Sequence, residues 1–212
     1  MLVEAVPPDR RAALKARHRR AILDAAKTLI SEGGTARFSV DQLAERADIS
    51  RRTVFNHFAS IDDVVTTVCT EVLGAVIDTF RTQVTTAPVE QGSRSAMFAT
   101  VTAALRATDI PGLIGFIYRA LGGFGTGDPR PQQIFQASFS RTTGELAHEL
   151  AERNADLDPL EAEVLVSSLM HGIEVIAHHW LTETGADTGA AARARWDDLL
   201  DRLVASIRKG YQ

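Results

Sequence analysis

The chain has 212 residues, of which 45% are hydrophobic and 24% charged, as expected for a soluble globular protein that buries a core. Its single cysteine, Cys69, excludes an internal disulfide framework, and no signal peptide or membrane span is visible, so we expect a cytoplasmic protein. Residues 1–60 carry a net charge of +4 and the rest −8. This asymmetry suggests an anionic partner at the N-terminal end, although a solvated basic tail gives the same count.

Apolar residues recur at helical spacing along almost the whole chain, without a convincing alternation of strand residues, which predicts an all-α fold. Local signals place the helix ends: Gly33 and Gly34 close the first helix, Ser39 and Ser60 open capping boxes, and "DPLE" at 158–161 opens the eighth. The expected helices cover residues 14–32, 39–47, 50–58, 60–84, 94–107, 109–121, 131–154, 158–184 and 190–209.

The segment "DISRRTVFNHF", residues 48–58, resembles the second half of a helix-turn-helix. Asp48 is expected in the left-handed conformation of the turn, where Gly is the easier choice. We expect Val54, Phe55 and Phe58 to face inward and the polar side chains to face outward. The first helix would supply an apolar face of Ile22, Ala25, Ala26, Leu29 and Ile30.

The side chains expected outward on the third helix suit the major groove of DNA. Arginine can bond guanine with two hydrogen bonds, asparagine can bond adenine, and the threonine methyl can contact thymine. The outward set is Arg51, Arg52, Thr53 and Asn56. Phosphate contacts are expected from His57, from the starts of the second and fourth helices, and from arginines of the first helix. A solvated amphipathic helix with ordinary surface arginines is the alternative.

Three blocks, "AILDAAKTLISEGG", "FSVDQLAERADIS" and "TVFNHFASIDDV", resemble the DNA-binding head of TetR-family bacterial regulators over about residues 17–65. The resemblance implies a homodimer with a DNA-binding domain at 1–60 and an effector-binding and dimerisation domain at 61–212. It places Arg51, Arg52, Thr53 and Asn56 at groove-facing positions. It places Ser39, Phe55 and His57 at positions that commonly approach phosphates.

The sequence departs from the family pattern at four positions. Asp48 replaces the usual turn glycine, and Arg52 replaces a small residue. Phe55 replaces a tyrosine and Ile61 a lysine, so two phosphate contacts are lost. We expect Arg52 and the basic N-terminal segment to compensate.

The N-terminal segment "DRRAALKARHRR" is rich in arginine, and three interpretations of it stay open. It could be a disordered arm that enters the minor groove, an extension of the first helix that contacts phosphates, or a solvating tail.

The last two helices are long and amphipathic, with more apolar surface than one chain obviously needs. The resemblance implies that they pair with their copies in a four-helix dimer interface; packing within one chain is the alternative. The apolar positions are Leu165, Leu169, Gly172, Ile173, Ile176 and Trp180 on the first, and Trp196, Leu199, Leu200, Leu203 and Ile207 on the second.

An effector pocket is expected among the helices between residues 60 and 180, with mostly apolar walls and a few polar groups that orient the ligand. The apolar candidates are Met97, Phe98, Leu105, Phe116, Tyr118, Phe135, Phe139 and Met170. The polar candidates are Arg119, His171, Glu174 and His178. Each aromatic residue taken singly is more often plain core.

Two histidine patterns invite a metal interpretation, and we favour neither. His171, Glu174 and His178 share a helix face, but a dimer interface or pocket wall gives the same spacing. Glu145 and His148 form a Glu-x-x-His pair, but a di-iron enzyme needs a second such pair. We therefore expect no catalytic site, no metal and no cofactor. The glycine loop at 122–127 lacks the context of a phosphate cradle and is interpreted as a flexible loop that could serve as a gate to the pocket.

The resulting prediction is a transcriptional repressor that binds a palindromic double-stranded DNA operator and leaves it when an unknown, mostly apolar small effector binds. A di-metal enzyme and an architectural DNA binder are the competing interpretations. No membrane partner is expected.

Overall fold

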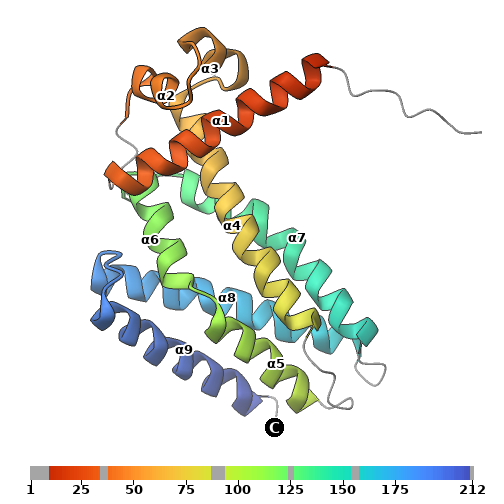
Figure 1. The fold of residues 1–212 in the computed structure, drawn as a ribbon. Coiled ribbons are helices and arrows are strands. Elements are labelled where there is room, and N and C mark those ends of the chain that lie inside the picture. The colour runs from red at the N-terminus through yellow and green to blue at the C-terminus, as the bar shows by residue number, and fades with distance from the viewer. Residues whose placement is uncertain (1–9, 34–37, 87–93, 124–126, 154–157, 211–212) are drawn as a thin grey trace, which may run out of the picture. The chain divides into compact units, whose positions relative to one another are not determined.

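The computed structural model describes residues 10–33, 38–86, 94–123, 127–153 and 158–210, and these are helical apart from caps and turns, with no strand among them (Figure 1). The all-α prediction is therefore confirmed. The helices are α1 (Arg10–Gly33), α2 (Val40–Arg46), α3 (Arg51–His57), α4 (Ile61–Thr86), α5 (Arg94–Ala107), α6 (Ile110–Ala120), α7 (Arg130–Arg153), α8 (Pro159–Thr184) and α9 (Ala190–Gly210).

The N-terminal helix begins earlier than the sequence pattern predicts. α1 starts at Arg10 rather than Leu14, because the segment from Arg10 to Arg20 consists mainly of Ala, Leu, Lys and Arg, which favour helix. Of the three interpretations of this basic segment, the disordered arm does not apply from Arg10 onward. The segment extends α1, and Lys15, Arg17, Arg19 and Arg20 are exposed on it.

The chain divides into two compact units, which we describe separately. The first, the head, comprises residues 1–69 together with 119–125; the second, the body, comprises 70–118 and 126–212. The long helix α4 contributes residues to both units. Among the described residues no helix is long and apolar enough to cross a membrane.

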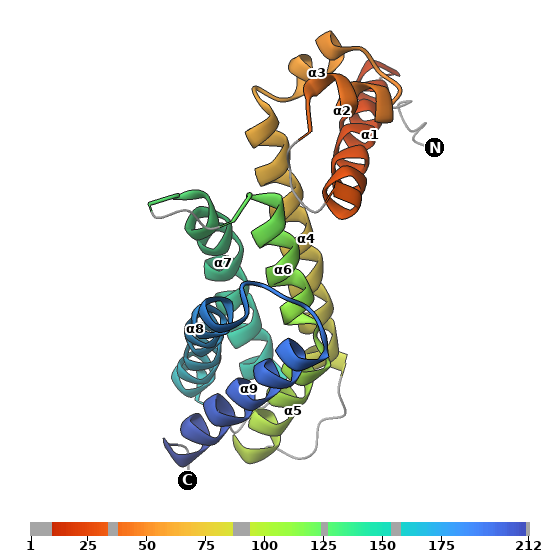
Figure 2. The same cartoon turned by 90° about the vertical axis from the view of Figure 1, so that its left-hand side faces the viewer.

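The head is built on the apolar face of α1, against which α2 and α3 pack (Figure 2). The buried side chains of these three helices and of the residue after α3 include Ile22, Leu23, Ala26, Ile30, Leu43, Val54 and Phe58. The guanidinium of Arg19 lies 4.4 Å from the centre of the Phe58 ring, which adds a cation–π contact between α1 and the end of α3.

Phe55 is not part of this core, and its predicted inward position is wrong. Its side chain is 50% exposed, whereas Val54 and Phe58 are 2% exposed. Val54 and Phe58 are four residues apart and share one face of α3, but Phe55 is rotated about 100° away from Val54. The ring therefore lies on the surface of the head.

The turn between α2 and α3 takes the conformation that the sequence predicts. Asp48 has a φ of 53°, in the left-handed region. The Ile49 amide donates to the Ala44 carbonyl at 3.0 Å, and the Asp48 amide donates to the Glu45 carbonyl at 3.1 Å. These two bonds form a Schellman motif, which satisfies the last carbonyls of α2 and redirects the chain into α3.

In the body, α8 and α9 run side by side in opposite directions (Figures 1 and 2). Asp158 caps the start of α8, and Gly185 ends it with a φ of 62°. The Trp180 indole donates to the Ala192 carbonyl at 2.7 Å and meets the Trp196 ring edge to face. The hairpin is therefore fixed by both apolar packing and a buried hydrogen bond.

The apolar faces predicted to form a dimer interface are covered within the single chain. Leu165, Leu169 and Trp180 are fully buried, and the remaining large side chains of the two predicted faces are buried or packed against the body core. A Cβ placed on Gly172 would overlap the methyl groups of Leu203, so α8 and α9 approach closely there. The premise of excess apolar surface on these two faces is thus incorrect, because α8, α9 and the other helices of the body bury these side chains in one core.

Candidate nucleic-acid interface

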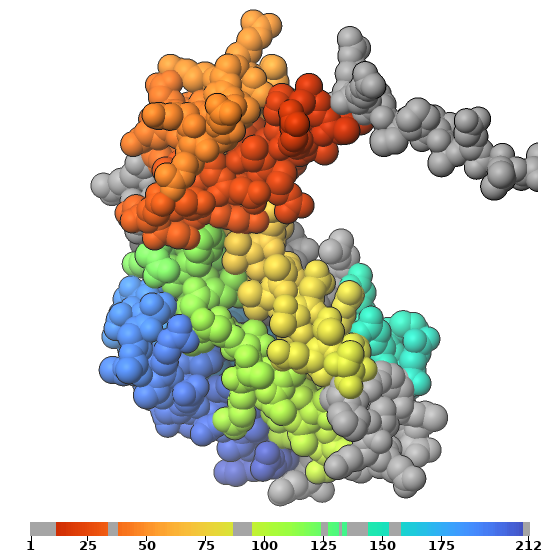
Figure 3. All heavy atoms as spheres, viewed as in Figure 1, coloured from red at the N-terminus to blue at the C-terminus, as the bar shows by residue number. Residues whose placement is uncertain are grey.

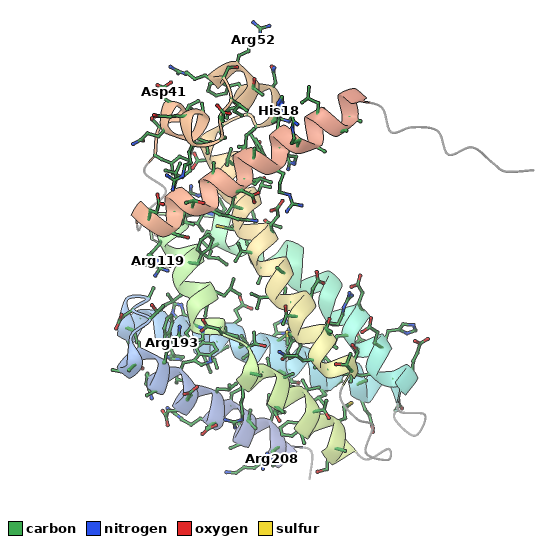
Figure 4. The ribbon with its side chains drawn as sticks, viewed as in Figure 1. His18, Asp41, Arg52, Arg119, Arg193 and Arg208 are labelled. Carbon is green, nitrogen blue, oxygen red and sulfur yellow. The ribbon has the colours of Figure 1, made fainter. Side chains whose placement is uncertain are left out.

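The short helix α3 presents a polar side to solvent while its apolar side is fixed against α1. Ser50 caps its start: the Ser50 hydroxyl accepts a hydrogen bond from the Thr53 amide at 3.1 Å. Arg51, Arg52 and Asn56 are exposed. In Figure 4 the Arg52 side chain extends away from the ribbon. The two arginines and Asn56 can therefore donate to groups outside the chain.

The two adjacent arginines differ in their surroundings. Arg51 faces Asp41 of α2: its Nε lies 3.3 Å from Asp41 Oδ1, and its Nη1 lies 3.3 Å from Asp41 Oδ2. Arg52 forms no hydrogen bond or ion pair with any described residue. The Arg51 guanidinium is thus paired with a carboxylate of the head, whereas that of Arg52 is exposed without a described partner.

Ser39 and Thr53, two further predicted contact residues, take part in helix caps. The Ser39 hydroxyl accepts from the Gln42 amide at 3.2 Å, and the Gln42 side chain accepts from the Ser39 amide at 2.8 Å, as predicted for a capping box. The half-buried Thr53 hydroxyl lies 2.9 Å from that of Ser50. Both hydroxyls therefore have a structural partner besides any phosphate or base.

His57 lies at the end of α3 beside a basic part of α1. Its ring meets the His18 ring edge to face, with centroids 6.1 Å apart. Partial burial holds the pKa of His57 below its usual value, and the positive charges of His18, Lys15 and Arg19 lower it further. His57 is therefore mainly neutral at pH 7 in the absence of an anion, and an approaching phosphate would favour its protonation.

Phe55 and Ile61 are the two apolar positions at which phosphate contacts were expected to be lost. Phe55 is exposed on α3, and Ile61 is half-buried at the start of α4. The Ser60 hydroxyl accepts from the Asp63 amide at 3.1 Å, and the Asp63 carboxylate accepts from the Ala59 amide at 3.0 Å. The start of α4 is thus capped as predicted, with the returning bond made to Ala59 rather than to Ser60.

In the space-filling view the atoms of α1 adjoin those of α2 and α3 on the face of the head that is shown (Figure 3). That surface combines hydrogen-bond donors on α3 with positive charge on α1. The combination suits a duplex, which offers base edges in its groove and phosphates along its borders.

The predicted ligand-binding residues occupy several different environments. Met97, Phe98 and Leu105 belong to the buried core of the body, and Tyr118 and Met170 pack against it. Phe116 is half-buried, and Arg119 groups by its contacts with the head unit. The side chains of Phe135 and Phe139 lie outside the described residues, as do residues 124–126 of the glycine loop. Among the described residues, the predicted ligand-binding side chains therefore do not line a common cavity.

The polar candidates on α8 are exposed rather than enclosed. His171, Glu174 and His178 are all on the surface of this helix. Among the described residues no three His, Cys, Asp or Glu side chains are placed to hold a metal ion. Glu145 pairs with Arg81 at 2.9 Å, and His148 lies 3.3 Å from Glu152, so the Glu-x-x-His pair has two separate partners.

Two features of the body were not predicted. An open groove of about 450 Å³ lies between α7 and α8, and its lining contains none of the predicted ligand-binding residues. Gln83 of α4 has a buried side-chain oxygen without a hydrogen-bond partner among the described groups. The groove is lined by Gly144, Ala147, His148, Ala151, Glu152, Pro159 and Glu163.

Two functional candidates in the head were missed as well. Asp41 and His18 contact predicted DNA-binding residues, but from positions 10 and 39 residues away in the chain. The sequence offers only two weak signals for these contacts: an acidic side chain in the second helix and a histidine in the basic N-terminal segment.

Comparison with known proteins gives a family match for the N-terminal part of the chain and solved structures of similar fold. Residues 22–68 match the model of bacterial regulatory proteins of the tetR family. A candidate TetR-family transcriptional regulator from Mesorhizobium loti MAFF303099 superposes with a TM-score of 0.56 at 19% identity, over 91% of this chain and 97% of that one. A candidate transcriptional regulator from Pseudomonas aeruginosa PAO1 gives a TM-score of 0.48 at 19% identity, over 97% of both chains. No curated protein matches the sequence.

Proposed function

The head of this chain belongs to the TetR family of bacterial regulatory proteins, and from that premise we propose a homodimeric cytoplasmic repressor that a small, mostly apolar effector releases from a palindromic operator. The observation that carries the proposal is the division of α3 into two sides. Val54 and Phe58 are buried, whereas Arg51, Arg52 and Asn56 are exposed. A helix held in this way can enter the major groove without unfolding any of the head.

Affinity and sequence preference come from different parts of the head. Arg51, Arg52 and Asn56 contact base edges, and Thr53 contributes its methyl group. Ser39, His57 and the edge of the Phe55 ring lie at the phosphates, together with cations of α1. Because Phe55 and Ile61 cannot supply the usual polar contacts, the exposed cations of α1 carry more of the salt-dependent binding.

A palindromic operator requires two heads about one DNA turn apart, ~34–36 Å. The dimer forms through the outward side of α8 together with α9, rather than through the faces that these helices bury against each other. Leu160, Val164 and Val175 are 66%, 46% and 57% exposed on α8, and His171 lies among them at helical spacing. Their spacing places an apolar stripe along one side of the helix, which suits a two-fold contact with the same stripe of a second copy.

Release follows from a preference of the effector for one conformation of the body. α4 contributes residues to both units, so a displacement of its body part changes the spacing of the two heads. The effector binds one conformation of the body more tightly than the other. This difference in binding free energy sets the upper limit for the loss of operator affinity. The apolar candidates for the pocket remain those named from the sequence, and Gln83 is an additional candidate for a polar contact.

Selection of bound sites from random duplex DNA tests the proposal. A repressor selects an inverted repeat, and its affinity for that repeat falls steeply as the salt concentration rises. Binding without a preferred repeat supports an architectural DNA binder instead. No salt-dependent binding to any duplex overturns the proposal. Native mass spectrometry of the purified protein then identifies a retained effector, whose addition is expected to release the selected DNA.

A further inference from the structure

The ion pair between Asp41 and Arg51 joins the two helices of the helix-turn-helix on the exposed side of the head. Two of the guanidinium nitrogens face the two carboxylate oxygens, each at 3.3 Å. We propose that Asp41 is a specificity-determining residue: it positions Arg51 for one base pair of the operator without contacting that base itself. This inference rests on the proposed DNA-binding function.

The pair contributes little to folding, because both side chains are more than 60% exposed and water screens their attraction. Its effect is conformational. Arginine has many rotamers, and two contacts to a fixed carboxylate restrict the guanidinium to a small part of that range. The backbone of Asp41 is itself fixed, because Asp41 lies in the first turn of α2 within the capping box that Ser39 and Gln42 form.

The contact with Asp41 leaves Arg51 able to read a base. Asp41 faces Nε and Nη1, so the other terminal nitrogen and the remaining hydrogen of Nη1 point elsewhere. These are sufficient for two bonds to the O6 and N7 atoms of guanine. When a duplex displaces water, the carboxylate also balances the positive charge of the guanidinium in a medium of lower dielectric constant.

The same carboxylate opposes DNA binding in general, because it places a negative charge near phosphates. Removing it is therefore expected to change affinity and sequence preference in opposite directions. Affinity for unrelated duplexes rises, whereas discrimination at the base pair read by Arg51 falls. Arg52 has no such partner among the described residues, so its base preference is independent of Asp41.

The experiment compares the full-length wild type with Asp41→Ala, Arg51→Ala and the double variant. Each is bound to the selected operator and to a set in which every base pair of one half-site is replaced in turn. We expect Asp41→Ala to lose on the order of 5-fold in discrimination at the position that Arg51→Ala also affects, and at no other. In the Arg51→Ala background, Asp41→Ala should have no further effect on discrimination.

Glu45→Gln is the matched control, because Glu45 is an exposed acid on the same helix and has no ion pair with a described residue. It should raise affinity for all duplexes and leave discrimination unchanged.

Unchanged discrimination in Asp41→Ala overturns the proposal, and so does increased discrimination, which would mean that Asp41 sequesters Arg51. An effect of Asp41→Ala that persists without Arg51 also overturns it, because Asp41 would then read DNA directly. If the wild type selects no site, both this inference and the proposed function fail, whereas a selected site with intact discrimination in Asp41→Ala rejects the inference alone.

Discussion

The rings of His18 and His57 meet edge to face, 6.1 Å apart between centroids, and join the basic part of α1 to the end of α3. Burial is the main cause that holds the pKa of His57 below its usual value of about 6.5, and His18, Lys15 and Arg19 add to it. The unfolded chain therefore binds more protons than the folded head near that pH. The stability contributed by neutral His57 is fully present above about pH 6.5 and is lost as the pH falls below this value and through the lower pKa of the folded head.

Operator binding is expected to depend on pH in the opposite direction. A phosphate beside His57 favours the protonated ring, so binding takes up a proton. Affinity should rise as the pH falls from about 8 to about 6, by at most ~10-fold per pH unit for each proton taken up. Fluorescence anisotropy of a labelled operator, recorded at constant ionic strength and at each pH, measures this affinity. His57→Gln should abolish most of the dependence, whereas His148→Gln, on the exposed side of α7, should not; affinity that is constant or falls on acidification contradicts the prediction.

Arg52→Ala is expected to weaken binding to the selected operator by about 1–3 kcal/mol and to relax preference at one base pair, because Arg52 is exposed and donates to no described residue. Affinity for unrelated DNA should fall much less. Arg20→Ala removes the same charge from α1 and serves as the control, with a similar loss on all sequences. An equal loss on all sequences from Arg52→Ala would show that Arg52 contacts only the backbone.

The sequence was most informative where structure is determined by neighbours in the chain. The caps at Ser39 and Asp158, and the left-handed Asp48, depend on hydrogen bonds within a few residues, and all three occur as predicted. The periodicity of apolar residues located the helices for the same reason.

Relationships between distant residues could not be predicted in this way. Phe55 is apolar, but its burial depends on the direction from which α1 crosses α3. The faces containing Leu165 and Trp196 were correctly identified as apolar, yet the pattern cannot show whether their own chain or a second copy covers them. The contacts of Asp41 with Arg51, and of His18 with His57, arise only when the helices are packed.

Substitution of Asp48 tests the turn between α2 and α3. Its φ of 53° suits glycine, and Asp tolerates it better than Ala does. Asp48→Gly is expected to leave the thermal unfolding midpoint unchanged or higher. Asp48→Ala should destabilise the head by about 1 kcal/mol, as measured by urea unfolding followed by circular dichroism. Equal effects of the two substitutions would indicate that the strain at this position is negligible.

Gly172 and Leu203 form a complementary pair in the α8–α9 hairpin. A methyl group at position 172 would overlap the Leu203 side chain, so Gly172→Ala is expected to cost about 1–3 kcal/mol despite the higher helix propensity of alanine. Leu203→Ala alone should also destabilise, by removing a contact with the core. Together the two substitutions should cost less than the sum of their separate effects, because the new methyl group occupies space that Leu203 vacates. Additive free energies of unfolding would contradict this explanation.

Val175 lies in the exposed stripe proposed as the dimer contact, and it is 57% exposed in the single chain. Val175→Glu should leave the helical content intact, because the side chain lies outside the core. In a two-fold contact, however, the substitution places two carboxylates close together in a region that loses water. We expect the variant to be monomeric in light scattering and to bind a two-half-site operator roughly 100-fold more weakly, since the second head no longer binds at high effective concentration. Ala99→Glu, at an exposed position of α5, is the control and should remain dimeric. A dimeric Val175→Glu variant with full operator affinity would place the contact between copies elsewhere on the body.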